Sequence, residues 1–140
     1  RPRRFGKSLF LDTLRQAFLA KKELFQGLYL ENNWDWSVRY PVIHISFGSG
    51  VIEDEKDLIN NTNFILERCQ EELEVKCKYI GDYKNCFHEL IIRASQKYNQ
   101  KTVVLIDEYD KPILDRIEDR EKAIRICEKL KNFYSVLKDA

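Results

Sequence analysis

Residues 1–10 read Arg1-Pro2-Arg3-Arg4-Phe5-Gly6-Lys7-Ser8-Leu9-Phe10. Gly6-Lys7-Ser8 followed by an apolar run is typical of the second half of a phosphate-binding loop, whose backbone N–H groups point at a nucleotide's phosphates. In such a loop the lysine reaches the β- and γ-phosphates, and the serine hydroxyl binds Mg²⁺. The stretch predicts a nucleotide-binding turn that leads directly into a helix. Its candidate binding residues are Arg4, Phe5, Gly6, Lys7, Ser8 and Leu9, with Ser8 also a candidate metal ligand.

The motif departs from the full pattern at one position. A complete loop has a glycine five places before Gly6, where this sequence has Arg1. Arg3 and Arg4 add positive charge beside the turn. They have three open interpretations: extra charge for the β- and γ-phosphates, a solvated loop, or contact with a partner. Nucleic-acid binding is disfavoured, because the net charge is only +1 and no aromatic residues interleave with the arginines.

A second stretch supplies the acidic groups that such a site needs. It reads Val103-Val104-Leu105-Ile106-Asp107-Glu108. The run is short, β-branched and bounded by polar residues, so it predicts a strand at about 102–107 that is buried on both faces. A strand that ends in two carboxylates places them at the carboxyl edge of a sheet, where open α/β sheets bind ligands. Asp107 would hold Mg²⁺ through water, and Glu108 would orient or deprotonate the attacking water. The alternative is that both residues simply begin a charged turn.

The rest of the chain alternates helices with one more strand. Residues 41–47 predict a strand whose odd-numbered side chains share one face. Helices are expected at about 7–19 and 54–73, in a third segment capped by Asp82, and in a last segment capped by Asp119. Strands that alternate with long helices indicate an α/β fold with parallel strands.

Composition indicates one globular domain without a large net charge. The chain has 140 residues, of which 44% are hydrophobic and 34% are charged. Its formal net charge of +1 gives no general attraction to nucleic acid or membranes, and no apolar run is long enough to span a bilayer. We expect residues 1–140 to form one domain. Because a phosphate-binding loop normally follows a buried strand, we also expect that strand to precede Arg1 in a longer protein.

The cysteines are expected to be reduced. They are Cys69, Cys77, Cys86 and Cys127, and they form no C-x-x-C pair. With only two histidines, far apart in the sequence, these residues predict no zinc site. Reduced, partly buried thiols are typical of cytoplasmic proteins. The sequence therefore predicts a cytoplasmic location.

Trp34, Trp36 and His44 each have a functional and a structural interpretation. The indoles are able to stack on an adenine ring, but aromatic side chains packed against the domain body are the usual case. His44 has no identifiable carboxylate or cysteine partner, so a hydrogen-bonded histidine on a half-buried strand is the better interpretation. We therefore expect structural roles for all three.

Six stretches together carry a family resemblance. They are Arg1-Pro2-Arg3-Arg4-Phe5-Gly6-Lys7-Ser8-Leu9, Lys22-Glu23-Leu24-Phe25, Trp34-Asp35-Trp36, Pro41-Val42-Ile43-His44-Ile45, Leu105-Ile106-Asp107-Glu108-Tyr109-Asp110-Lys111-Pro112-Ile113 and Phe133-Tyr134-Ser135. With them the sequence resembles the AAA-ATPase-like domain of uncharacterised bacterial proteins, over nearly the whole chain. In that family the domain often precedes a nuclease-like domain of the PD-(D/E)XK type.

The resemblance implies a P-loop NTPase fold, an αβα sandwich with parallel strands, of which this chain is an incomplete fragment. Glutamate directly after Asp107 favours the branch with an additional central strand. In that branch the segments 41–47 and 102–107 are neighbours, and the central strands lie outside the chain. The resemblance assigns Gly6, Lys7 and Ser8 to phosphate and metal (the Walker A motif), Asp107 to the metal (Walker B), and Glu108 as the catalytic carboxylate. The family itself tends to carry Arg-Pro-Arg-Arg in place of the first glycine.

Three functions are compatible with these features. The first is an ATPase module that hydrolyses ATP with Mg²⁺ and switches or powers an attached effector, expected to be a C-terminal nuclease-like domain. The second is a nucleotide-binding switch with little or no hydrolysis, and the third is a protein-interaction scaffold whose site is empty. ATP rather than GTP follows from the resemblance, since no guanine-reading motif is found. Contact with membranes, or with nucleic acid by this part of the protein, is not expected.

Overall fold

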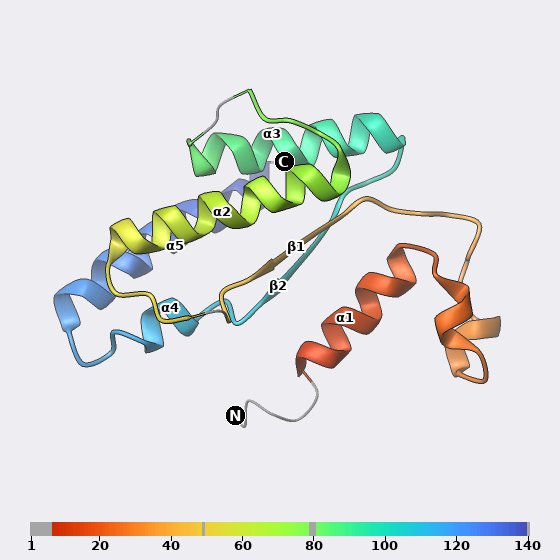
Figure 1. Ribbon diagram of the computed structural model, residues 1–140, viewed down its shortest axis with the longest axis horizontal. Coiled ribbons are helices and arrows are strands. Elements are labelled where there is room, and N and C mark those ends of the chain that lie inside the picture. The colour runs from red at the N-terminus through yellow and green to blue at the C-terminus, as the bar shows by residue number, and fades with distance from the viewer. Residues whose placement is uncertain (1–6, 49, 79–80, 140) are drawn as a thin grey trace.

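The computed structural model describes residues 7–48, 50–78 and 81–139 of the chain (Figure 1). In order, its elements are α1 (Lys7–Phe18), the 3₁₀ turns η1 (Lys22–Phe25) and η2 (Tyr29–Asn32), β1 (Val42–Ser46), α2 (Glu55–Leu73), α3 (Tyr83–Tyr98), β2 (Val103–Asp107), α4 (Lys111–Leu114) and α5 (Arg120–Asp139). The predicted helices and strands are confirmed, and their ends shift by no more than a single residue where bounds were predicted.

β1 and β2 form a parallel two-stranded sheet. The register pairs Val42 with Val103 and Ser46 with Asp107, so the two strands end together. Parallel strands need a long crossover connection, and α2 and α3 supply it here. The α/β class and the neighbouring parallel strands are therefore confirmed. Within the described residues these two strands make up the sheet, which is consistent with a fragment of an α/β fold.

Helices lie on both faces of the sheet (Figure 1). On one face Ile43, Ile45 and Phe47 are buried in the core that α2, α3 and α5 complete. α1 lies on the other face and contacts both strands. Because side chains alternate along a strand, His44 and Ser46 lie on the α1 face. This alternation gives the sheet one apolar face and one face with polar groups near its carboxyl end.

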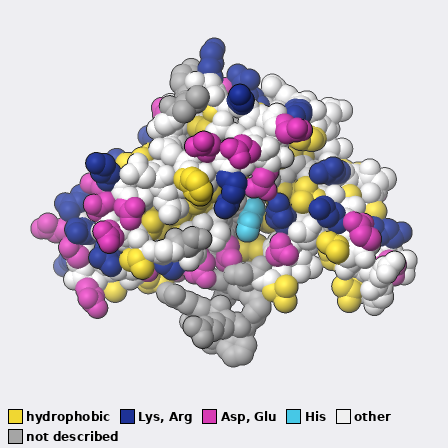
Figure 2. Space-filling view, viewed as in Figure 1, with side chains coloured by type: hydrophobic (Ala, Val, Ile, Leu, Met, Phe, Trp, Pro, Cys, Tyr) yellow, Lys and Arg dark blue, Asp and Glu magenta, His cyan; other side chains and the backbone are white. Residues whose placement is uncertain are grey.

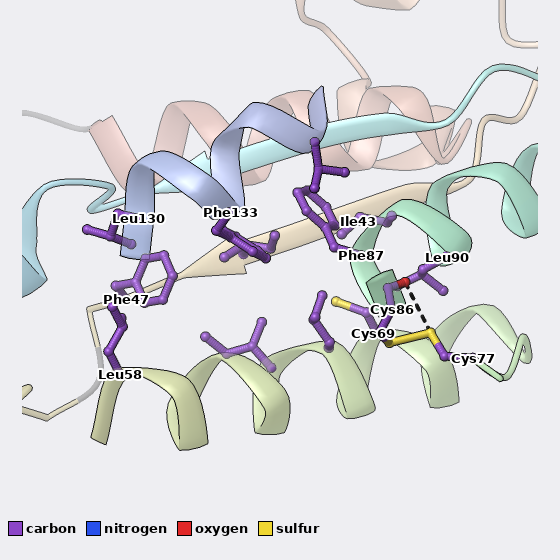
Figure 3. Close-up of a cluster of buried hydrophobic side chains, with 14 of the residues drawn as sticks. Ile43, Phe47, Leu58, Cys69, Cys77, Cys86, Phe87, Leu90, Leu130 and Phe133 are labelled. Atoms are coloured by element: carbon purple, nitrogen blue, oxygen red, sulfur yellow. Dashed lines mark hydrogen bonds between the residues drawn. A yellow bond between two sulfur atoms is a disulfide. The ribbon is translucent and has the colours of Figure 1, made fainter. Parts of the chain in front are cut away.

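Aromatic stacking ties together the helices of the core. Phe87 of α3 stacks on Phe133 of α5 with ring centroids 4.5 Å apart, and both rings are fully buried. Figure 3 shows these rings converging with Ile43 of β1, while Leu58 and Cys69 approach from α2. Fully burying a side chain of this kind stabilises the fold by about 1.5–3 kcal/mol. The core thus holds one face of the sheet to α2, α3 and α5.

Aspartates begin α2, α3 and α5. Asp54, Asp82 and Asp119 each accept a hydrogen bond from the backbone N–H three residues later, at 2.8, 3.3 and 3.2 Å. Such a cap satisfies one of the free N–H groups of the first turn and is worth about 1 kcal/mol. The predicted caps at Asp82 and Asp119 are confirmed.

β2 is less buried than its sequence predicts. Leu105 and Asp107 are buried, but Val103, Val104 and Ile106 are only partly buried. A strand buried on both faces needs cover along its whole length. In the described residues β2 has a neighbouring strand on one edge only. The prediction of full burial is therefore wrong for this part of the protein.

The prediction of four reduced thiols is wrong. Cys77 and Cys86 form a disulfide that joins the segment after α2 to the first turn of α3 (Figure 3). Cys69 is a buried free thiol, and Cys127 is an exposed free thiol. The pairing depends on how α2 and α3 pack, and a separation of nine residues in the sequence does not reveal that.

The structural roles expected for the two tryptophans are confirmed. The Trp34 indole Nε1 donates to the Ala17 carbonyl at 3.0 Å, and its ring lies edge-on to Phe18 with centroids 5.3 Å apart. The Trp36 Nε1 donates to the Glu31 carbonyl at 2.9 Å. Both indoles thereby hold the segment after α1 against the end of that helix and the 3₁₀ turns.

Charges of both signs are mixed on the surface. Figure 2 shows Lys and Arg side chains among Asp and Glu side chains on the face that it draws, in keeping with the net charge of +1. Some form pairs one helical turn apart, such as Arg93 with Glu89 at 2.6 Å. Among the helices of the described ranges, none combines the length and the apolar composition that a membrane crossing requires.

Candidate functional site

The candidate site begins with a buried carboxylate at the end of β2. The Asp107 side chain is only 5% exposed, although it is charged and closes a strand. Its Oδ1 accepts a hydrogen bond from the Glu108 backbone N–H at 2.9 Å. Asp107 pairs in register with Ser46, and strand alternation places both on the α1 face. A largely buried carboxylate at the carboxyl end of a parallel strand lies where open α/β sheets bind ligands, so this position is a functional candidate.

Glu108 adopts a backbone conformation that is unusual for its type. Its φ of 53° lies in the left-handed region. For a residue with a side chain this conformation costs of order 1–3 kcal/mol, and residues that adopt it cluster at functional sites. The turn sends the chain away from β2 and leaves the Glu108 side chain half-buried. A Cβ added at Gly48 would lie 3.4 Å from the Glu108 Cγ. The two candidate carboxylates thus sit on a bent, closely packed turn.

Side chains and backbone groups hold this acidic turn, residues 107–111, in place. The Lys111 N–H donates to the Glu108 carbonyl at 3.2 Å. From α5, the Tyr134 hydroxyl donates to the Tyr109 carbonyl at 3.1 Å. Burial raises the pKa of the Tyr134 hydroxyl, and Asp110 adds to the effect, so this group stays a donor at neutral pH. The turn is therefore anchored to the helix layer.

α1 begins at the edge of the molecule where β1 and β2 end (Figure 1). Lys7 and Ser8 form its first two positions, and the structure describes their helical backbone. Leu9, also a predicted binding residue, has a side chain that is 70% exposed. The predictions for Arg4, Phe5 and Gly6 lie outside the described residues. The start of the helix and the acidic turn are accordingly found at the same edge of the sheet.

His44 lies two residues before Ser46 on the α1 face. Its Nε2 is buried and has no hydrogen-bond partner among the described residues, so the expected hydrogen-bonded histidine is wrong for this atom. Burial lowers the pKa of His44 below 6.5; the Arg15 charge lowers it further, and the Asp107 charge opposes this. A neutral imidazole beside the acidic turn is the result.

A metal ion at Asp107 would need ligands other than a cluster of acidic, histidine or cysteine side chains from the described ranges. No group of three or more His, Cys, Asp or Glu side chains in the described ranges is arranged to hold a metal ion. Mg²⁺ commonly takes one or two protein ligands and completes its shell with phosphate oxygens and water. One buried carboxylate near the start of a helix fits that coordination pattern.

A cavity of about 680 Å³ lies at the C-terminal half of α2, away from the acidic turn. Its lining includes three carboxylates, from Glu67, Glu71 and Glu74, and one lysine, Lys76, together with the Cys77–Cys86 disulfide. Carboxylates on this lining repel an anionic triphosphate. We therefore assign no nucleotide to this cavity.

Comparison with known proteins places the chain in a family. A family model described as predicted AAA-ATPase matches residues 1–140. The chain belongs to this family. An uncharacterized protein in the vnfD 5′ region of Azotobacter chroococcum mcd 1 is 47% identical over 140 residues, which is all of this chain and 27% of that protein. The chain therefore spans about a quarter of the length of this relative. No solved structure matches significantly.

Membership of the predicted AAA-ATPase family agrees with the resemblance and supports nucleotide binding in general. Sequence reasoning missed three residues that shape the acidic turn. They are Gly48, Lys111 and Tyr134. Lys111 and Tyr134 lie within stretches that carry the resemblance, but no local pattern shows what a lysine or a tyrosine there contacts. Only the folded arrangement brings these residues to the turn of this AAA-ATPase-like chain.

Proposed function

We propose that this chain is the nucleotide-binding part of an ATPase module that hydrolyses ATP with Mg²⁺. The observation that carries the proposal is the buried Asp107 at the end of β2, on the sheet face toward α1, whose first turn contains Lys7 and Ser8. Family membership adds support for nucleotide binding. An acidic strand end and a helix start at one sheet edge are the two halves that a metal–triphosphate site requires.

Each residue then has a defined chemical role. Gly6 and the backbone around it would hold the phosphates, Lys7 would contact the β- and γ-phosphates, and Ser8 and Asp107 would hold the metal, Asp107 through water. Bound Mg²⁺ neutralises charge that develops on the phosphate oxygens. Glu108 would be the catalytic residue, whose carboxylate orients or deprotonates the attacking water. The backbone of Glu108 takes a left-handed conformation, with a φ of 53°, directly after β2.

A second candidate is a nucleotide-binding switch that hydrolyses little or nothing. Arg1 in place of the first glycine favours it, because a side chain there limits how closely the backbone approaches the phosphates. Such a switch would still use Lys7, Ser8 and Asp107 for binding. The two candidates differ only in whether Glu108 has a catalytic role.

Phosphate release by the full-length protein separates these candidates. We expect Mg²⁺-dependent turnover that Lys7→Ala abolishes and that Glu108→Gln lowers by about 10²-fold or more. Matched controls are Lys22→Ala and Glu118→Gln, both at exposed positions. Without Lys7-dependent turnover, retained ATP binding supports the switch. Saturating Mg-ATP, at 100 times its Kd, should stabilise a binding protein by about 2.7 kcal/mol, and no stabilisation at millimolar Mg-ATP supports an interaction scaffold.

The proposal extends to the rest of the protein. We propose that the ATPase cycle switches or powers an attached effector, a C-terminal nuclease-like domain of the PD-(D/E)XK type. This extension rests on the family resemblance. Deleting the nuclease-like domain alone, and not the strands that complete the ATPase fold, should leave ATP binding intact and remove nuclease activity. Nuclease activity that does not depend on ATP and that Lys7→Ala leaves unchanged would contradict the coupling.

A further inference from the structure

Lys111, the last residue of the acidic turn, forms a largely buried ion pair. It opens α4, and its Nζ lies 2.9 Å from the Asp115 Oδ2 one helical turn later. The two side chains are only 13% and 14% exposed. Lys111 Nζ also donates to the Gly50 carbonyl at 2.6 Å. A largely buried ammonium group with two close oxygen partners is held in one position.

The ion pair holds a loop that follows β1. Asp115 Oδ2 accepts from the Ile52 backbone N–H at 3.4 Å, while Lys111 binds the Gly50 carbonyl. Gly50 has a φ of 73°, a conformation that glycine adopts at little cost. Lys111 and Asp115 therefore both form hydrogen bonds with the same short segment, residues 50–52. We refer to this arrangement as the Lys111 clamp.

The loop after β1 also begins close to the side chain of the candidate catalytic residue. Gly48 lies two residues before Gly50, and a Cβ placed on it would meet the Ser46 Oγ at 3.3 Å and the Glu108 Cγ at 3.4 Å. Gly48, at the start of the loop, thus packs close to the Glu108 side chain. Lys111 is connected to Glu108 a second time, through the hydrogen bond from its own N–H to the Glu108 carbonyl.

We infer that Lys111 is a positioning residue, which holds the loop after β1 against Glu108 and so restricts the directions that this carboxylate takes. The inference rests on the proposed function of Glu108 in hydrolysis. The alternative role for a lysine at this site is direct contact with phosphate. The structure argues against that role, because the ammonium group is largely buried and already bound by Gly50 and Asp115.

The test compares Lys111→Met with wild type in the full-length protein. Methionine keeps the apolar stem and removes the charge and the donors. Arg93→Met is the matched control, because Arg93 pairs with Glu89 at 2.6 Å, also one helical turn apart, on α3. The first readout is hydrogen exchange of residues 48–53 without nucleotide, and the second is kcat and KM for ATP. A purely stabilising role would change the thermal midpoint but not kcat per folded molecule.

We expect exchange at Ile52 to be about tenfold faster or more in Lys111→Met, kcat to fall about tenfold or more, and KM to change less than about twofold. Arg93→Met should match wild type in all three. Unchanged exchange in Lys111→Met would overturn the clamp. Faster exchange with unchanged kcat would overturn its positioning role. A wild-type protein without turnover would overturn the proposed hydrolysis instead, and the exchange measurement would still decide whether the clamp exists.

Gly48→Val provides a second variant if Lys111→Met fails to fold. It leaves the ion pair intact and adds a branched side chain next to the Glu108 Cγ. We expect kcat to fall about tenfold or more with KM for ATP nearly unchanged, and the smaller Gly48→Ala to show a smaller loss. Wild-type kcat in Gly48→Val would show that the loop does not restrict Glu108 and would overturn the inference.

Discussion

Ser46 of β1 and Asp107 of β2 are paired in register at the ends of two parallel strands. Strand alternation places both side chains, with His44, on the face toward α1, while Ile45 and Ile106 face the helix core. The sheet therefore concentrates its polar groups at one face and one edge. That placement makes the functional hypotheses specific enough to test with single substitutions.

Asp107→Asn is expected to abolish the metal dependence of nucleotide binding. Asparagine keeps the shape of the side chain and an oxygen that accepts from the Glu108 N–H, so the fold should persist. It lacks the negative charge that a hard cation such as Mg²⁺ prefers. Thermal shift with ATP, with and without Mg²⁺, measures the effect.

The matched control for this prediction is Asp119→Asn. Asp119 also accepts a backbone N–H bond, from Lys122 at 3.2 Å, but it caps α5 and does not belong to the acidic turn. Asparagine caps helices about as well as aspartate. We expect the control to respond to Mg-ATP like wild type. An Asp107→Asn protein that Mg-ATP stabilises as fully as it does wild type would refute the metal role of this carboxylate.

His44→Gln is expected to change how stability depends on pH. Burial, helped by Arg15 and opposed by Asp107, lowers the pKa of His44 below 6.5 in the folded protein. The unfolded chain therefore binds this proton at a higher pH than the folded protein does, and the free energy of unfolding falls as the pH drops below 6.5. Above that value the contribution is fully present.

Denaturant unfolding between about pH 7 and about pH 5 measures this contribution. Wild type should lose more stability over that range than His44→Gln does, because glutamine takes up no proton. The difference between the two pH profiles removes the contribution of the carboxylates, which titrate in both proteins. Parallel pH profiles for the two proteins would show that the histidine ring is not held neutral by the fold.

Alkylation should distinguish the four cysteines. Burial raises the pKa of the Cys69 thiol to about 11, and its side chain is 3% exposed, so it should not react in the native protein near pH 8. Cys127 is an exposed free thiol and should react. Peptide mapping without reductant should recover Cys77 linked to Cys86. Recovery of both as alkylated single peptides would mean that they are reduced in solution.

Phe87→Ala is expected to destabilise the domain by about 3–5 kcal/mol, because it removes a fully buried ring and leaves a cavity. The lost ring stacks on Phe133 at 4.5 Å. Phe64→Ala is the matched control, since this phenylalanine on α2 is 66% exposed and should change stability by about 0.5 kcal/mol or less. The two variants are compared by denaturant unfolding. An equal loss of unfolding free energy in both would mean that Phe87 does not belong to the core.

Much of the fold could be predicted because its signals are local. The apolar alternation of residues 41–47 and the β-branched run at 103–107 each indicate a strand from a few neighbouring side chains. Asp82 and Asp119 mark helix starts through hydrogen bonds to residues only three positions away. The degree of burial of β2 was predicted wrongly, because it depends on what lies beside the strand and not on the strand itself.

By itself, the sequence determined the order of helices and strands, the shared face of the strand at 41–47, and the two candidate motifs that end at Ser8 and begin at Asp107. Periodicity, caps and motif spacing act over short stretches of chain. Only the tertiary structure decided that Cys77 joins Cys86, that Glu108 takes a left-handed backbone, and that Lys111 reaches Gly50. These features depend on contacts between separate segments. Such contacts arise from how helices pack on a sheet, which no local pattern of residue types encodes.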